Sequence, residues 1–184
     1  AAVVIGGGLY YKFSHKPAPE ATVAEAPASS GKLKACWVYV GPVGDFGYSY
    51  QHDQGRKAVE KELGDKVETA FVENVAEGPD ADRAIERLAR EGCGIIFTTS
   101  FGFMDSTIKV AKKYPKVKFC HATGYKRADN VATANARYYE GRYLAGIAAG
   151  RMTQSGSVGY VAGFPIPEVL QVGSSAGTLG GRPR

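Results

Sequence analysis

The sequence predicts an α/β fold built on a parallel sheet, and two observations support this prediction. Short apolar segments alternate with longer segments of helical period from residue 33 to residue 162. The apolar segments are rich in Val, Ile and Phe, as is typical of strands buried on both faces. Regular strand–helix alternation favours parallel strands joined by right-handed crossovers.

Each element follows from its local pattern. The expected strands, in order, are Leu33–Val40, Lys66–Val72, Gly94–Thr99, Lys116–His121, Val131–Ala136 and Ser157–Ala162. The expected helices are Tyr50–Leu63, Pro79–Glu91, Met104–Lys113 and Tyr138–Thr153. The second helix has the clearest start, because Gly78-Pro79-Asp80 places a proline in the first turn and an acid near the positive helix end.

Composition indicates a globular protein with an ordinary surface. The chain has 184 residues, 44% of them hydrophobic and 22% charged, which suffices for a packed core. The net charge of +5 could favour an anionic partner, but basic residues lie beside acids, as in the run from Arg56 to Glu62. Since no basic stripe or recognition motif occurs, we expect no nucleic-acid partner.

The chain divides into four parts. Residues 1–32 begin with an apolar stretch too short to span a bilayer and continue as a Pro/Ala/Ser/Glu-rich tether, so we expect the remnant of a signal or membrane anchor. Residues 33–125 form the first α/β lobe, and residues 126–169 form a hinge crossover and the start of a second lobe. Residues 170–184 have neither helical nor strand period and are interpreted as a disordered or artefactual tail.

Three cysteines occur, at positions 36, 93 and 120. They lack CxxC spacing and a nearby pair of histidines, which argues against a zinc site. The odd number leaves at least one thiol without an internal partner. Cys36 and Cys120 fall in expected strands, where we predict small buried thiols.

The loop from Gly41 to Tyr48 is the first part of the candidate site. In an open α/β sheet, ligands bind outside the carboxyl ends of the strands, and this loop follows the first strand. It offers the Asp45 carboxylate and the rings of Phe46 and Tyr48. Rings that stack on a flat ligand and a carboxylate that accepts its N–H groups suit a nucleobase or nucleoside. Alternatively, Asp45 is only a turn or capping residue, and Phe46 packs beneath its loop.

Two further loops complete the candidate site. Ser100, Phe101 and Gly102 follow the third strand and precede a helix, where hydroxyl and backbone N–H donors favour acceptors. Phe164 follows the last expected strand. Ser100 could instead cap its helix. The lone His121 at a strand end is interpreted as structural.

Motifs for catalysis and phosphate binding are absent from the sequence. The first loop has the spacing GxxGxxG rather than the dinucleotide pattern GxGxxG, and no GxxxxGK[ST] occurs. The sequence has three histidines and no GxSxG motif, which argues against a hydrolytic triad. We therefore name no catalytic residue, no metal and no cofactor.

Four segments together resemble the basic membrane protein (BMP) family. They are Gly44-Asp45-Phe46-Gly47-Tyr48, the run from Thr98 to Phe103, the run from Ala111 to Phe119, and the run from Tyr139 to Gly146. The resemblance, over residues 33–169, implies a type I periplasmic-binding fold and a substrate-binding protein of an ABC importer. It also implies a purine base such as adenine, or a nucleoside, as ligand, with Asp45 on the base, Tyr48 and Phe164 stacking, and residues 100–102 in the pocket. Thr123 stands where the family has an acid.

The resemblance further implies an extracytoplasmic location, possible membrane anchoring at the N-terminus, a membrane permease as partner and a monomer at full length. Hinge closure near residues 123–130 would trap the ligand. Two other hypotheses remain open: a nucleotide-dependent Rossmann-like enzyme, and a ligand-sensing regulatory domain of the same fold.

Overall fold

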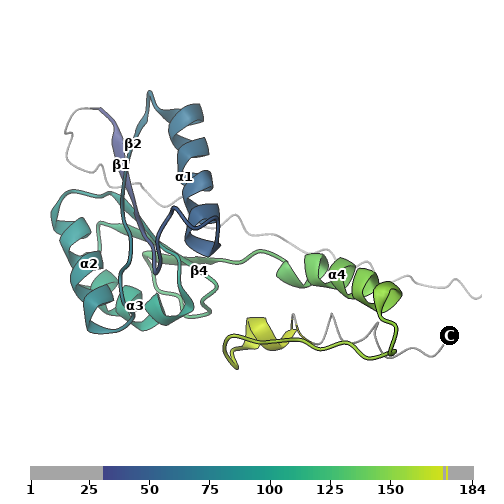
Figure 1. The fold of residues 1–184 in the computed structure, drawn as a ribbon. Coiled ribbons are helices and arrows are strands. Elements are labelled where there is room, and N and C mark those ends of the chain that lie inside the picture. The colour runs from purple at the N-terminus through teal and green to yellow at the C-terminus, as the bar shows by residue number, and fades with distance from the viewer. Residues whose placement is uncertain (1–30, 172, 174–184) are drawn as a thin grey trace, which may run out of the picture.

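A computed structural model describes residues 31–171 and residue 173 (Figure 1). The strands are β1 (Leu33–Val38), β2 (Val67–Val72), β3 (Ile95–Thr98), β4 (Lys118–Ala122) and β5 (Val131–Ala134). The helices are α1 (Tyr48–Leu63), α2 (Pro79–Arg90), the 3-10 helix η1 (Phe101–Phe103), α3 (Met104–Lys113) and α4 (Tyr138–Met152). A further helical turn spans 167–171.

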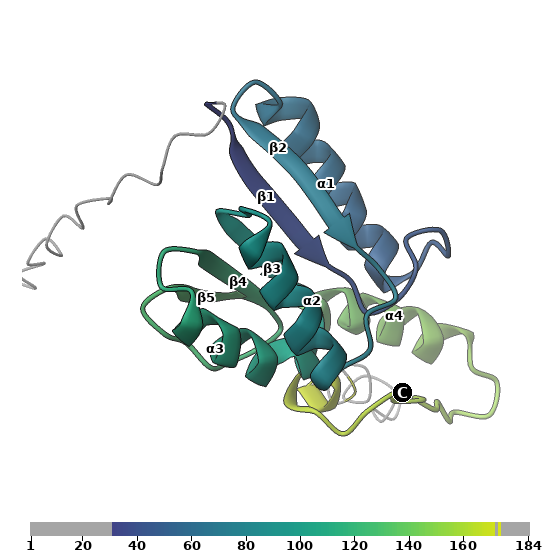
Figure 2. The same ribbon diagram turned by 90° about the vertical axis from the view of Figure 1, so that its left-hand side faces the viewer.

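The five strands form one parallel sheet in the order β2-β1-β3-β4-β5. The α/β class and the parallel sheet predicted from the sequence are confirmed. Helix α1 lies on one face of the sheet, and α2 and α3 lie on the other (Figures 1 and 2). We call residues 31–134 the sheet domain.

Alternate residues of β1 supply the two halves of the core. Cys36 and Val38 pack with Ile85, Leu88 and other residues of the α2 and α3 side. Trp37 points to the opposite face, where its ring stacks on Phe97 with centroids 4.6 Å apart. Because successive side chains of a strand alternate between faces, one strand of six residues anchors both layers.

A disulfide joins Cys36 in β1 to Cys93 in the turn after α2, and both residues are buried. Their Cα atoms are 6.0 Å apart, although 57 positions separate them in sequence. The expectation of a buried thiol at Cys36 is therefore wrong. The crossover through α2 brings Cys93 back beside β1. The spacing of the cysteines in the sequence does not reveal this proximity. Cys120 is free and partly exposed.

Residues 135–171 and 173, which we call the arm, extend away from the sheet domain (Figure 1). The strand predicted at Ser157–Ala162 does not form; the segment is irregular, and Val161 is 97% exposed. A strand needs a neighbour to satisfy its backbone groups, and the described part of the arm contains none.

Two segments near the expected domain limits have regular structure. β5, which the expected division places after the limit at residue 125, pairs with β4 in the same sheet. Leu170 and Gln171, expected in an irregular tail, belong to the helical turn 167–171. The predicted tether lies outside the described residues except for positions 31 and 32, as do position 172 and the tail from residue 174 onward.

Candidate ligand-binding site

The loops after β1, β2, β3 and β4 gather at the carboxyl edge of the sheet, because all the strands are parallel. This edge is where open α/β sheets bind ligands. The candidate residues of the first and third loops both lie at this edge, as the sequence predicted. Phe164 belongs to the arm and is 71% exposed, and it is not among the residues that line the cleft described below.

Hydrogen bonds fix the first loop to its surroundings. The Val43 N–H donates to the Glu73 carboxylate at 2.7 Å, and the Gly41 N–H donates to Ser49 Oγ at 3.1 Å. Asp45 Oδ1 accepts from the Gly47 N–H at 2.8 Å, so one of its oxygens holds a local turn. Asp45 thus acts as a turn residue here, while its exposed position leaves the carboxylate open to solvent.

Phe46 does not pack beneath the loop. Its backbone has a φ of 57°, and its side chain is 80% exposed. The ring rests against Tyr50 with centroids 4.9 Å apart. An exposed ring on a left-handed residue is an unusual arrangement for a structural phenylalanine. It leaves one face of Phe46 available for stacking.

Tyr48 is the first residue of α1 and lines a cleft of about 440 Å³ between the sheet domain and the arm. The other side chains in this cleft include two tyrosines, one cation and one carboxylate, namely Tyr138, Tyr160, Arg142 and Glu168. Burial raises the pKa of the Tyr48 hydroxyl, and the neighbouring Tyr138 and Glu168 raise it further. Burial likewise raises the pKa of Glu168. Tyr48 therefore remains a neutral phenol.

A buried ionic network holds α1, and with it Tyr48, against the sheet. Asp53 accepts from Arg56 Nε at 2.7 Å and pairs with Lys57 Nζ at 3.0 Å. The hydroxyl of the buried Tyr39 also donates to Asp53, at 3.4 Å. Burial opposes ionisation of Asp53, but hydrogen bonds from Arg56 and Lys57 prevail and lower its pKa. Because Arg56, Lys57 and Tyr39 occupy the Asp53 carboxylate, we assign Asp53 to holding α1 in place and not to ligand contact.

The third loop is organised around a carboxylate that the sequence analysis did not single out. Ser100 Oγ donates to Glu77 Oε1 at 2.6 Å, and the Gly102 N–H donates to the same oxygen at 3.2 Å. A side chain at Gly102 would overlap the Glu77 carboxylate. Ser100 therefore bonds Glu77 and does not cap its helix. Phe101 is partly exposed, 6.3 Å from the Tyr125 ring.

His121 at the end of β4 is buried in a hydroxyl network. Thr107 donates to the Phe103 carbonyl at 2.7 Å, so its oxygen accepts from Thr98 Oγ1. Thr98 in turn accepts from His121 Nδ1 at 2.9 Å, which assigns the proton to Nδ1. Burial lowers the pKa of His121 to about 4. This environment agrees with the predicted structural role.

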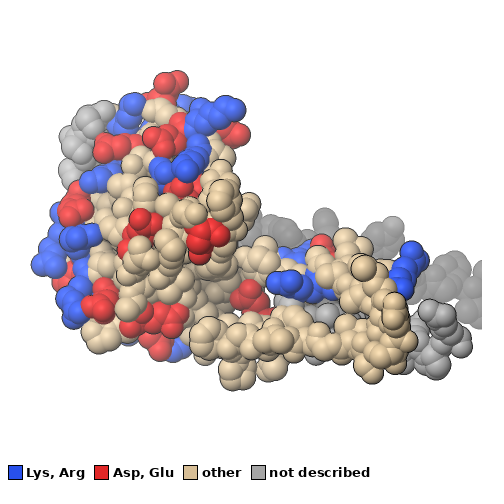
Figure 3. Space-filling view, viewed as in Figure 1, with Lys and Arg blue, Asp and Glu red and all other residues tan. Residues whose placement is uncertain are grey.

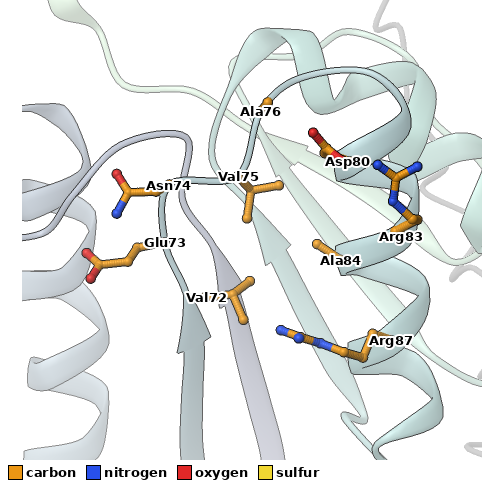
Figure 4. A pocket seen from close by; sticks show the side chains of 9 residues that line it. All are labelled: Val72, Glu73, Asn74, Val75, Ala76, Asp80, Arg83, Ala84 and Arg87. Atoms are coloured by element: carbon orange, nitrogen blue, oxygen red, sulfur yellow. Dashed lines mark hydrogen bonds and ion pairs between the residues drawn. The ribbon is translucent and has the colours of Figure 1, made fainter.

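A second cleft, of about 370 Å³, lies beside β2 and contains none of the predicted site residues (Figure 4). Val72 and Ala84 line its floor, and Arg87 reaches across it from α2 (Figure 4). Arg83 forms an ion pair with Asp80 in the first turn of α2. The cleft is mixed in charge and mostly open, so we assign no ligand to it.

On the face shown in Figure 3, basic and acidic side chains are interspersed over the sheet domain. Among the described residues, no group of three or more His, Cys, Asp or Glu side chains could hold a metal ion. In the same part of the chain, no helix has both the length and the apolar character needed to cross a membrane.

Sequence reasoning missed Glu77 and the arm residues of the 440 Å³ cleft. A signal for Glu77 existed: it follows the second strand at the same edge, a loop that the sequence analysis left out. No such signal exists for Tyr138 or Glu168, because their approach to Tyr48 depends on how the arm lies.

Comparison with known proteins places the chain in a family. Residues 32–174 match the family model Bmp, described as ABC transporter substrate-binding protein PnrA-like. A purine-binding protein of Brucella abortus is 61% identical over 140 residues, which are 76% of this chain and 40% of that protein. A protein of Haloferax volcanii, named as an ABC transporter glucose-binding protein, is 43% identical over 152 residues, which are 83% of this chain and 38% of that protein.

Solved structures share the fold. A solute-binding protein of an ABC transporter system from Aeropyrum pernix matches with a TM-score of 0.61 at 24% identity, covering 76% of this chain and 40% of that one. A transcriptional activator of the comK gene from Bacillus halodurans matches with a TM-score of 0.60, also at 24% identity. The match covers 80% of this chain and 50% of that one. The chain spans about two fifths of the length of these two curated relatives. It belongs to the Bmp family of PnrA-like ABC transporter substrate-binding proteins.

Proposed function

We propose that the chain is the ligand-capturing part of an extracytoplasmic receptor, which binds a purine base or nucleoside and delivers it to an ABC permease. The observation that carries the proposal is the 61% identity over 140 residues to a purine-binding protein of Brucella abortus. An adenine-like base is the ligand we expect. Family membership itself gives a transport protein and not an enzyme.

The site supports this ligand class through rings and donors at one edge of the sheet. Tyr48 lines the cleft, and Phe46 and Phe101 offer partly or wholly exposed rings nearby along the same edge. Stacking on a planar base contributes about 0.5–1.5 kcal/mol per ring beyond area burial. Asp45, Ser100 and Gly102 add polar contacts, and Phe164 would approach from the arm. These contacts remain predictions.

The disulfide supports an extracytoplasmic location. Cys36 and Cys93 form a buried bridge, and such bridges persist in oxidising compartments. In the cytosol, thiols are kept reduced. Anchoring to the membrane, the identity of the permease and a monomeric state are parts of the proposal that rest on the family alone.

Capture would proceed by closure of the arm over the carboxyl edge of the sheet. The link 135–137 between β5 and α4 is the crossing in the described chain, whereas the expected hinge segment 123–130 joins β4 to β5 within the sheet. Contacts made only in the closed state shift the population toward that state. The cleft already places Tyr138 and Glu168 opposite Tyr48, which supports closure at this point.

Binding to the purified chain tests the proposal. We expect adenine or a nucleoside to raise the melting temperature, since ligand that binds only the folded state stabilises it. Ribose, glucose and NAD serve as the other members of the panel, glucose because of the name of the Haloferax volcanii relative. A shift with glucose alone would indicate that the ligand is a sugar and not a purine. A shift with NAD alone would favour a nucleotide-dependent enzyme.

Replacement of Asp45 tests the assigned role of its carboxylate. We expect Asp45→Ala to weaken binding of the base more than Tyr48→Phe, because the phenylalanine ring still stacks. Isothermal titration with adenine measures both dissociation constants. An unchanged affinity in Asp45→Ala would remove Asp45 from the site and leave it as a turn residue.

A further inference from the structure

Glu77 occupies an unusual position at the carboxyl edge of the sheet. It lies in the loop between β2 and α2, and its side chain reaches the start of the loop after β3. The carboxylate fills the space that a side chain at position 102 would take. Glycine at this position thus permits a close approach of Glu77 to the backbone.

The two oxygens of this carboxylate have different environments. Both the Ser100 hydroxyl, at 2.6 Å, and the Gly102 N–H, at 3.2 Å, donate to Oε1. Within the described part of the chain, Oε2 receives no hydrogen bond and Glu77 forms no ion pair. The side chain is exposed, so Oε2 remains accessible. Two donors on one oxygen therefore orient an acceptor whose other oxygen is open.

Other acids near this edge have partners of a different kind. Asp45 uses Oδ1 in its own turn, and Glu73 holds the Val43 N–H at 2.7 Å. Asp53 is buried between Arg56 and Lys57. Glu77 differs because its partners come from the third loop, where the sequence predicted ligand contacts, and because they are neutral donors that leave its charge uncompensated.

We propose that Glu77 is a specificity-determining residue whose free carboxylate oxygen accepts a hydrogen bond from an N–H or O–H donor of the ligand. The inference rests on the proposed function, because it concerns the same site. Ser100 and Gly102 are positioning residues that fix the orientation of the carboxylate. Both the amino and ring N–H groups of adenine and the hydroxyls of a ribose have this donor chemistry.

The variant Glu77→Gln tests the proposal with little change of shape. The glutamine oxygen still accepts from Ser100 and Gly102, while its NH₂ group replaces the free acceptor by a donor. We expect adenine to bind roughly 10- to 100-fold more weakly, since a charge-assisted hydrogen bond is lost. Ser100→Ala keeps the carboxylate but removes one of its two orienting donors, so its loss of affinity should be smaller.

Glu62→Gln is the matched control. Glu62 is an exposed acid near the end of α1, whereas the carboxyl edge lies at the start of this helix. This variant removes the same charge and should leave the affinity unchanged. Titration calorimetry of the four chains with adenine and with adenosine gives the constants, and melting temperatures confirm that each variant folds. A loss with both ligands assigns the donor to the base; a loss with adenosine alone assigns it to the ribose.

Three results would overturn the inference. Equal affinities of wild type and Glu77→Gln would remove Glu77 from the site while the proposed function stands. An equal loss of affinity in Glu62→Gln would show that the effect of Glu77→Gln comes from the change in net charge alone. If the folded wild-type chain binds neither adenine nor adenosine, the proposed function fails and the inference fails with it.

Discussion

The sheet domain and the arm use apolar residues in opposite ways. In the sheet domain, Ile85, Ile96 and Phe119 are at most 2% exposed and belong to one cluster. In the arm, Leu144 is 66% exposed and Val161 is 97% exposed. Stability therefore resides in the sheet domain, whereas the arm contributes rings and charges to the cleft at their border. The comparison teaches that folding depends on the buried residues of the sheet domain, and we expect ligand capture to depend on exposed residues at the border.

The strongest test of this division is a matched pair of truncations. Phe119→Ala empties a buried site in β4 and should lower the free energy of unfolding by about 3–5 kcal/mol. Leu144→Ala removes an exposed side chain of α4 and should change it by less than about 0.5 kcal/mol. Urea denaturation followed by circular dichroism measures both. Similar losses would show that the arm is part of the same cooperative core.

Removal of the disulfide should weaken the sheet domain alone. The double variant Cys36→Ala/Cys93→Ala loses the bridge and is expected to be about 2–4 kcal/mol less stable, because the unfolded chain gains freedom. Cys120→Ala is the control, since that thiol is free and partly exposed. The same denaturation experiment applies. An undiminished stability in the double variant would show that the bridge does not form in solution.

Acid should act on the sheet domain through His121. Burial lowers its pKa to about 4, below the ordinary value of 6.5, so the unfolded chain binds more protons between these pH values. This contribution to stability is complete above pH 6.5 and falls with the pH, by up to about 3 kcal/mol near pH 4. His121→Gln, which does not titrate, should show a flatter dependence of unfolding free energy on pH. Parallel profiles would exclude His121 as the cause.

The smallest effects are expected at the border of the two regions. Tyr48→Ala should weaken binding of a purine by about 0.5–1.5 kcal/mol through lost stacking, without lowering stability by as much as Phe119→Ala does. Phe164→Ala should have less effect on affinity, because Phe164 does not line the cleft. Calorimetry with adenine compares the two variants. A larger loss at Phe164 would indicate that closure brings the arm into a different position.

Local signals predicted the sheet domain well. The proline at the start of α2 and the apolar runs of β1 to β5 are short-range patterns, and each of these elements formed near its expected position. Long-range relations were not predictable in this way. The Cys36–Cys93 bridge depends on how a crossover returns to the sheet, and the contact of Ser100 with Glu77 depends on the order of the strands. Ser157–Ala162 has a strand pattern, but none of the strands in the described residues pairs with it.

Trp37 gives the chain a built-in optical reporter. It is the single tryptophan of the sequence, it is 6% exposed, and it stacks on Phe97 within the sheet domain. Its emission will therefore follow unfolding of the sheet domain and remain nearly silent when only the arm moves. The tyrosines of the cleft, Tyr48, Tyr138 and Tyr160, absorb and emit at shorter wavelength. A tyrosine signal that changes while the emission of Trp37 stays constant would therefore report a change that leaves the core of the sheet domain folded.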